Sequence, residues 1–238
     1  MKNLVFALSL LLTLPALARD YFKVDFNDAK PEEKPAVQPY NRNTGSTAPT
    51  KLSELEPGLV KVIEKTATLT ERPLLFNLGL SSSPATELVF DGGNNLVTSG
   101  TVLIDFDVEP VSYKPTSDGR IETAFSIRVT GNSGIDIASI VFAATKPDSG
   151  AMALFPIGGP KVDLGSYELG KLYKFALALD LTAGELTVGI NGEIRADKVK
   201  INAANAYRLI RFRSGQALGG RDGALTVALD NIHIYDRQ

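Results

Sequence analysis

Alternation of apolar and polar residues with a period of two is the feature that most constrains how this chain folds. In Thr101–Glu109 every second residue is apolar, and Arg120–Val129 largely repeats the pattern. Tyr173–Ala196 adds two alternating runs with a turn between them, followed by Asn191-Gly192, a pair that tolerates positive φ at both positions of a type I′ turn. Successive side chains of a strand point to opposite faces, so these runs predict half-buried antiparallel strands.

Further strand-like runs occupy Tyr207–Gly215 and Ala224–Asp236, and no long amphipathic helix pattern lies between them. Strands of this length separated by Gly, Pro, Asn and Asp predict an all-β fold, an antiparallel β-sandwich of the jelly-roll kind. No repeat with a fixed period is visible, which argues against a propeller or a solenoid.

The first 18 residues have the three parts of a secretory signal peptide. Lys2 supplies the charge, Leu4–Leu14 the apolar run, and Ala16-Leu17-Ala18 the small-x-small cleavage site. We therefore expect residues 1–18 to be a signal peptide and the product to be secreted or periplasmic. No later stretch approaches the roughly 20 apolar residues of a membrane helix, so we expect no membrane span.

Composition changes again near residue 50. Residues 19–50 comprise a short strand-like start, Tyr21–Asp28, and a segment rich in proline and charge, Ala29–Thr50. Such a segment buries too little apolar surface to form regular structure, which predicts a loop or linker. Residues 51–238 have the composition of a folded sandwich domain.

Several functional classes are excluded by composition. Cysteine is absent, which rules out disulfides, thiolate metal sites and a cysteine nucleophile. The formal net charge is −2 and no basic face is evident, so we expect no nucleic-acid partner. The single histidine, His233, has no second histidine with which to share a metal, and alternation in the last strand places it outward beside Tyr235.

Four stretches resemble one known family: Val24–Asp28, Ser99–Pro110, Leu179–Glu193 and Leu229–Asp236. They are similar to the opening strand, an early strand, the strand-turn-strand unit and the closing strand of the concanavalin A-like lectin/glucanase jelly rolls, which include laminin-G-like domains. The resemblance implies that fold. The family contains lectins, hydrolases, lyases and adhesion domains, so it leaves the activity open.

Asp105, Asp107 and Glu109 are the candidate catalytic residues. They alternate on one strand, which places them on one face about 7 Å apart. Laminarinase-like hydrolases of this fold use Glu-x-Asp-x-Glu in that arrangement, and the resemblance implies a paired nucleophile and proton donor. Here Asp105 replaces the first glutamate, and the chain lacks the tryptophans that line those clefts.

A lyase of the same fold is a second enzymatic alternative. Alginate-lyase-like jelly rolls use Arg, Gln, His and Tyr from the concave sheet. This chain offers an arginine and a glutamate in Gly119–Val129, but no Gln-x-His pair. We therefore rank the lyase below the hydrolase.

The polar contact surface predicted for a ligand combines both signs of charge, and its expected members are Asp105, Asp107, Glu109, Arg128, Arg211 and Arg213. The aromatic residues expected to be exposed are Tyr113, Tyr167, Tyr207 and Tyr235. The glycine-rich stretch Ser214–Ala224 predicts a plain surface loop; the alternative is the rim of a glycan site, with Arg221 and Asp222 as polar contacts. Calcium would suit the oxygen-rich turns Phe90–Leu96 and Pro115–Arg120, and otherwise we expect no metal or cofactor.

These observations favour an exported, non-catalytic sandwich, either a lectin-like module that binds a polysaccharide or glycan or a surface-recognition module. Two alternatives stay open: a glycan-cleaving enzyme that uses the same face, and a structural or assembly protein of the cell envelope with a protein partner.

Overall fold

The computed structural model describes residues 19–54, 57–77, 86–93, 97–114, 123–202, 206–214 and 224–237. The strands are β1 (Arg19–Val24), β2 (Lys51–Ser53), β3 (Val60–Val62), β4 (Leu74–Phe76), β5 (Glu87–Asp91), β6 (Thr101–Lys114), β7 (Thr123–Gly131), β8 (Asp136–Ala144), β9 (Ser149–Pro156), β10 (Val162–Glu168), β11 (Tyr173–Asp180), β12 (Glu185–Ile190), β13 (Glu193–Lys200), β14 (Tyr207–Ser214) and β15 (Ala224–Arg237). The described segments contain no helix, and so none that could cross a membrane. The predicted signal peptide lies outside the described residues.

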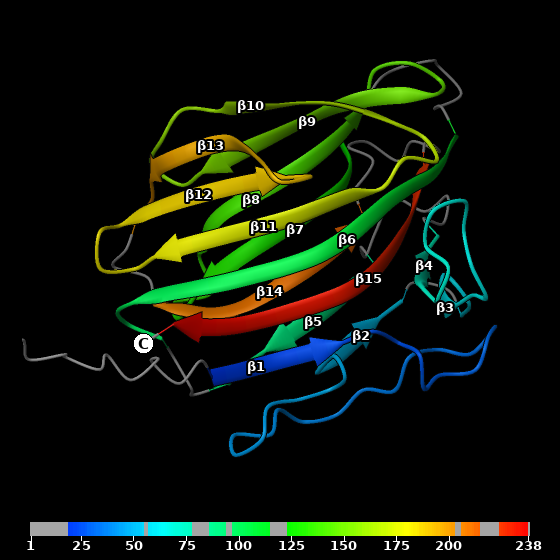
Figure 1. Ribbon diagram of the computed structural model, residues 1–238, viewed down its shortest axis with the longest axis horizontal. Coiled ribbons are helices and arrows are strands. Elements are labelled where there is room, and N and C mark those ends of the chain that lie inside the picture. The colour runs from blue at the N-terminus through cyan, green and yellow to red at the C-terminus, as the bar shows by residue number, and fades with distance from the viewer. Residues whose placement is uncertain are drawn as a thin grey trace, which may run out of the picture.

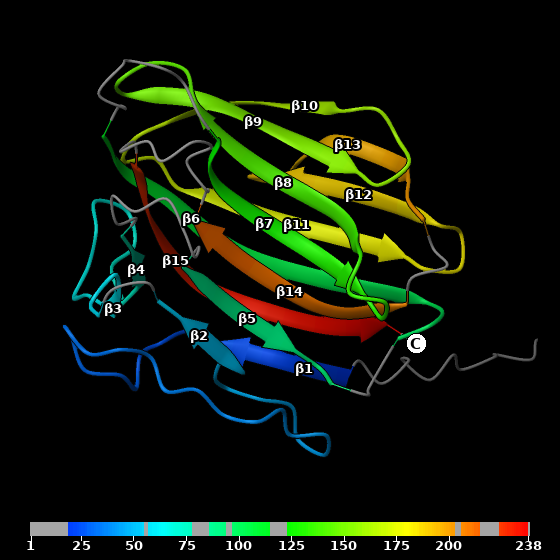
Figure 2. The ribbon, with the colours of Figure 1, turned by 180° about the vertical axis from the view of Figure 1, so that it is seen from behind.

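The strands form two antiparallel sheets packed face to face, which confirms the predicted β-sandwich. The eight-stranded sheet has the order β13-β12-β11-β6-β15-β4-β3, with β1 also paired to β15, and it faces the viewer in Figure 1. The seven-stranded sheet has the order β10-β9-β8-β7-β14-β5-β2 and faces the viewer in Figure 2. The consecutive strands β6 and β7 therefore belong to different sheets.

The hairpin pattern in the sequence is confirmed in detail. Strand β11 pairs with β12 from Phe175 opposite Ile190 to Asp180 opposite Glu185. The next connection is Asn191-Gly192, whose φ values of 54° and 81° are those of a type I′ turn. Its backbone twist matches the right-handed twist of the strands on either side, so the turn sets the register of β12 and β13.

Phenylalanine side chains connect the two sheets through the core. Phe106 on β6 stacks on Phe175 at 5.0 Å between ring centroids and meets Phe212 of the opposite sheet edge-on at 5.3 Å. Phe90 continues the contact to Phe212 at 6.0 Å. Such pairs contribute about 0.5–1.5 kcal/mol each beyond burial of their area. The core therefore uses the inward residue of each alternating pair, as the period of two predicts.

Residues 25–50, here called the N-terminal strap, lie along the edge of the sandwich beside β1 and β2 (Figures 1 and 2). Backbone hydrogen bonds attach the strap to both sheets: Glu32 N–H donates to Val62 O at 2.7 Å, and Thr50 N–H donates to Val89 O at 2.8 Å. The Tyr40 ring packs on Phe22 at 5.2 Å. The N-terminal strap contains no named strand or helix, and it closes one side of the sandwich (Figure 1).

Candidate functional site

The outer face of the seven-stranded sheet carries the arginines predicted as ligand contacts. On β7, Phe125, Ile127 and Val129 belong to the core, which directs the side chain of Arg128 outward. On β14, the core residues Ile210 and Phe212 direct Arg211 and Arg213 to the same outer face.

Strand register arranges these side chains in a transverse row. Arg211 lies opposite Arg128, Arg128 opposite Ser139, and Ser139 opposite Phe155. In the other direction Arg211 lies opposite Val89, and Val89 opposite Lys51. We call this set the arginine row: Phe155, Ser139, Arg128, Arg211, Val89 and Lys51. It crosses six strands and, at about 4.8 Å per strand, extends over roughly 24 Å.

The charges along this face do not balance. Arg128 donates to Asp136 at 3.2 Å, and Arg213 pairs with Glu87 at 3.2 Å. Arg211, which lies between Arg128 and Arg213 on this face, has no carboxylate partner in the described part of the chain. Like charges directly across two strands destabilise a sheet, so the Arg128–Arg211 pair favours an anion on this face.

Unmet hydrogen-bond donors accompany the charge imbalance. The Nε atoms of Arg128 and Arg211 are shielded from solvent and have no acceptor among the described residues. A buried donor without a partner costs about 1–3 kcal/mol, and arginine matches a carboxylate with two parallel hydrogen bonds. The Arg128 side chain is 35% exposed, so its guanidinium remains within reach of a ligand.

Phe155 ends the row as an exposed aromatic side chain, and it is not among the residues predicted from the sequence. Its ring is 40% exposed and Lys161 Nζ lies 5.8 Å from the ring centroid. Alternation in β9 gives the signal: Met152 and Leu154 are in the core, so Phe155 must face outward. An aromatic ring beside cations suits an anionic sugar polymer.

The six residues predicted to form one contact surface do not do so, because they lie on different sheets. Asp105, Asp107 and Glu109 share one face of β6 as predicted, but that face is the outside of the eight-stranded sheet. The arginines are on the outside of the opposite sheet. Alternation shows which residues face outward, and only the sheet order shows which outward residues meet.

Glu109 is buried under a loop and does not face an open cleft. Its side chain is 1% exposed, and it accepts hydrogen bonds from the hydroxyls of Thr66 and Thr68 and, at 3.1 Å, from the Thr68 N–H. A proton donor for a glycosidic bond needs access to that bond. The structure therefore gives Glu109 the role of holding residues 66–68 against β6.

Asp107 and Asp105 are also engaged within the eight-stranded sheet. Asp107 accepts a hydrogen bond from Asn231 Nδ2 at 3.0 Å and pairs with Lys174 Nζ at 3.5 Å. Asp105 accepts one from the Tyr235 hydroxyl at 3.2 Å. These contacts do not resemble the open carboxylate pair of a glycosidase.

Asp230 lies opposite Asp107 and is buried, at 3% exposure. Burial raises the pKa of Asp230 to about 7; the hydrogen bond from the Asn231 N–H opposes the shift, and the nearby charges of Asp107, Asp25 and Glu71 add to it. Asn231 has φ of 52° within the bulge that places Asp230 there.

His233 stands outward as predicted. Its ring stacks on Tyr235 at 4.3 Å, and its Nε2 lies 2.8 Å from Asp20 Oδ1. The prediction that Tyr167 and Tyr207 are exposed was wrong, because both are in the core, at 1% and 3% exposure. Tyr113 is partly buried, like Tyr235.

The described residues contain no group of three or more acidic or histidine side chains that could hold a metal ion. Within the predicted turn Phe90–Leu96, Asp91 pairs with Arg208 at 3.1 Å. The other predicted calcium turn, Pro115–Arg120, and the loop residues Arg221 and Asp222 lie outside the described residues, so calcium stays a prediction.

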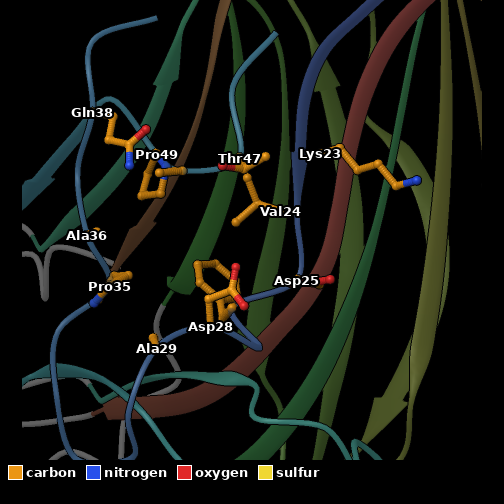
Figure 3. Close-up of a pocket in the computed structure, with 12 residues that line it drawn as sticks. Lys23, Val24, Asp25, Asp28, Ala29, Pro35, Ala36, Gln38, Thr47 and Pro49 are labelled. Carbon is orange, nitrogen blue, oxygen red and sulfur yellow. The ribbon is translucent and has the colours of Figure 1, made fainter. Parts of the chain in front are cut away.

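A cavity of ≈ 360 Å³ lies between β1 and the N-terminal strap (Figure 3). Val24, Phe26 and Pro49 form part of its apolar wall, and the side chains of Lys23 and Asp25 point away from the other lining residues (Figure 3). The charged side chains do not converge on one point within the cavity. We therefore interpret it as a gap in the packing under the N-terminal strap and not as a binding site.

Comparison with known proteins identifies the fold. No protein-family model matches the sequence, and no curated protein does. An alginate lyase of polysaccharide lyase family 7 (PL7) from Zobellia galactanivorans matches with a TM-score of 0.53 at 17% identity over 68% of this chain and 77% of that chain. A second PL7 alginate lyase matches with a TM-score of 0.53 at 14% identity over 76% and 84%.

An alginate lyase in complex with dimannuronate matches with a TM-score of 0.52 at 12% identity over 70% of this chain and 76% of that chain. A sialidase also matches, and the chain spans 17% of its length. The fold is a concanavalin A-like jelly roll.

For this jelly roll, the prediction of a non-catalytic module is corrected. The neighbours with TM-scores of 0.5 or more just described are enzymes that cleave a glycan, which favours the enzymatic alternative. Glu109, the third carboxylate of the predicted hydrolase site, is buried, which removes one of the residues on which the hydrolase hypothesis depended.

Proposed function

We propose that this jelly roll is a glycan-cleaving enzyme that acts on a polysaccharide of uronate sugars by elimination. The observation that carries the proposal is the pairing of Arg128 with Arg211 across β7 and β14, with no carboxylate partner for Arg211 among the described residues. The proposal takes its reaction class from neighbours that share the fold and are alginate lyases. The arginines are positively charged, so the proposed substrate is a negatively charged polymer.

The chemistry gives the arginines a specific task. In elimination a base removes the C5 proton of a uronate, the electron pair forms the C4–C5 double bond, and the C4 oxygen leaves with a proton. Negative charge develops on the carboxylate as C5 loses its proton. Fixed cations at that position lower the barrier because they are already oriented before the reaction starts. Arg128 and Arg211 are two such cations on a rigid sheet.

The arginine row also suggests how the polymer lies. A chain across the strands would meet Phe155 at one end, the arginine pair in the centre and Lys51 at the other end. The aromatic ring offers an apolar platform and Lys51 a further cation. Ser139, between Phe155 and Arg128, offers a hydroxyl to the sugar.

The deciding experiment is a screen for unsaturated uronate products. Polymers of uronates should give the ultraviolet absorbance of a C4–C5 double bond, and neutral glucans should not. Silence on every uronate polymer would overturn the proposal, and release of reducing ends without that absorbance would show hydrolysis instead of elimination.

A further inference from the structure

Asp236 is a buried carboxylate that receives the first residue of β1. It is 6% exposed, and both of its oxygens accept hydrogen bonds: Oδ1 from the Arg19 backbone N–H at 3.0 Å and Oδ2 from the Tyr21 hydroxyl at 2.7 Å. Arg19 and Asp236 are opposite each other in the β1–β15 ladder. The contact thus joins the beginning of the described chain to its last strand.

The described side chains give this carboxylate no cationic partner. The Arg19 guanidinium is directed elsewhere, since it donates to Arg42 O at 2.8 Å and lies 5.3 Å from the Tyr21 ring centroid. Neutral donors compensate a buried charge less well than a cation does. The group that lies closest to Asp236 Oδ1 is therefore a neutral backbone N–H, at the position where a positively charged nitrogen would form an ion pair.

The sequence offers a source of that charge. Ala16-Leu17-Ala18 is a small-x-small cleavage site, and the residue that follows it is Arg19. A signal peptidase would add water across the Ala18–Arg19 peptide bond, leaving a carboxylate on Ala18 and an amine on Arg19. An α-amine has an ordinary pKa of about 8 and is mainly protonated at neutral pH.

We propose that cleavage after Ala18 converts the Arg19 nitrogen into an α-ammonium group that forms an ion pair with Asp236 and locks β1 to β15. Maturation then strengthens the sandwich edge, because the ammonium adds an attraction between opposite charges to a hydrogen bond that has only one charged partner in the precursor. The precursor has the same strands but a neutral amide at this position.

The surroundings of Asp236 set the direction of the pH dependence. The groups that face it are Tyr21 and Arg19 from β1 and Tyr40 from the N-terminal strap. Burial and the hydrogen bond to Asp236 raise the pKa of the Tyr21 phenol, so it stays a neutral donor. An amine beside a carboxylate has a raised pKa in the folded state. Its stabilisation is full below about pH 8 and disappears as pH rises through the raised pKa.

The test compares a chain that begins at Arg19 with one that begins at Ala18. At pH near 6.5 we expect the Arg19 form to melt about 2–4 °C higher. The difference should vanish near pH 11 and in the variant Asp236→Asn, and it should survive in Tyr21→Phe, which keeps the carboxylate. Mass spectrometry of the exported protein should find Arg19 at the N-terminus. Equal melting at pH 6.5, or a different N-terminal residue, would overturn the proposal.

Discussion

Arg128 and Arg211 lie directly opposite each other on the neighbouring strands β7 and β14, with their Nε atoms shielded and without acceptors in the described segments. Two guanidinium groups in this relationship repel each other, and the sheet retains them on an outward face where glutamine would be tolerated. The pair is the basis for the first prediction.

Replacing Arg211 by Gln should lower kcat/KM on a uronate polymer by about 10- to 150-fold, because a hydrogen bond to a charged group contributes about 1.5–3 kcal/mol. Stability should stay equal or rise by up to about 1 kcal/mol as repulsion is removed. Steady-state kinetics and thermal melting measure the two effects. Arg195→Gln on β13, whose side chain is 45% exposed, is the matched control and should change neither.

Phe155→Ala should raise KM about two- to tenfold with little change in kcat, since an aromatic contact contributes about 0.5–1.5 kcal/mol to binding. Ile194→Ala removes another exposed apolar side chain, from the opposite sheet, and should leave KM unchanged. An equal effect of the two variants on KM would show that the Phe155 ring does not bind the polymer as part of the arginine row.

Glu109→Gln should destabilise the fold by about 1–3 kcal/mol, because the hydrogen bonds from Thr66 and Thr68 all end on Glu109 Oε2 and become weaker when a neutral amide oxygen replaces the charged one. Turnover per folded molecule should be preserved. The control is Glu193→Gln, which has a 70% exposed side chain. Loss of turnover with unchanged melting would restore Glu109 as a catalytic candidate.

Asp230 predicts a pH dependence of stability. Its pKa is raised from the ordinary 3.8 to about 7, so the folded state holds a proton that the unfolded state has released. Stability should therefore fall as pH rises from about 4 to 7, by up to about 4 kcal/mol at 1.36 kcal/mol per pKa unit. Asp230→Asn keeps the acceptor for Asn231 N–H and should flatten the urea-unfolding profile over that range. A profile unchanged by the variant would assign the dependence to other groups.

The class of fold could be predicted from the sequence because apolar and polar residues alternate along each strand, which distinguishes its buried face from its exposed face. Alternation predicted Arg128 as an outward residue and Asn191-Gly192 as a turn, and the structure has both. The same rule applied to β9 would have identified Phe155. These features depend on neighbours in sequence.

Features that depend on contacts between residues far apart in the sequence could not be predicted from alternation. The assignment of β6 and β7 to different sheets separates the carboxylates from the arginines, and alternation is the same in either arrangement. Burial of Glu109 depends on residues 66–68, some 40 positions earlier in the chain. The predicted export and envelope partner stay predictions.

The most direct test of the central claim is product formation by the wild type and the Arg128→Gln/Arg211→Gln double variant on a panel of uronate polymers and neutral glucans. The account predicts ultraviolet absorbance of unsaturated uronates from at least one anionic polymer, none from neutral glucans, and loss of the product in a double variant that melts like the wild type. Undiminished product from the folded double variant, or no product from any uronate polymer, would contradict it.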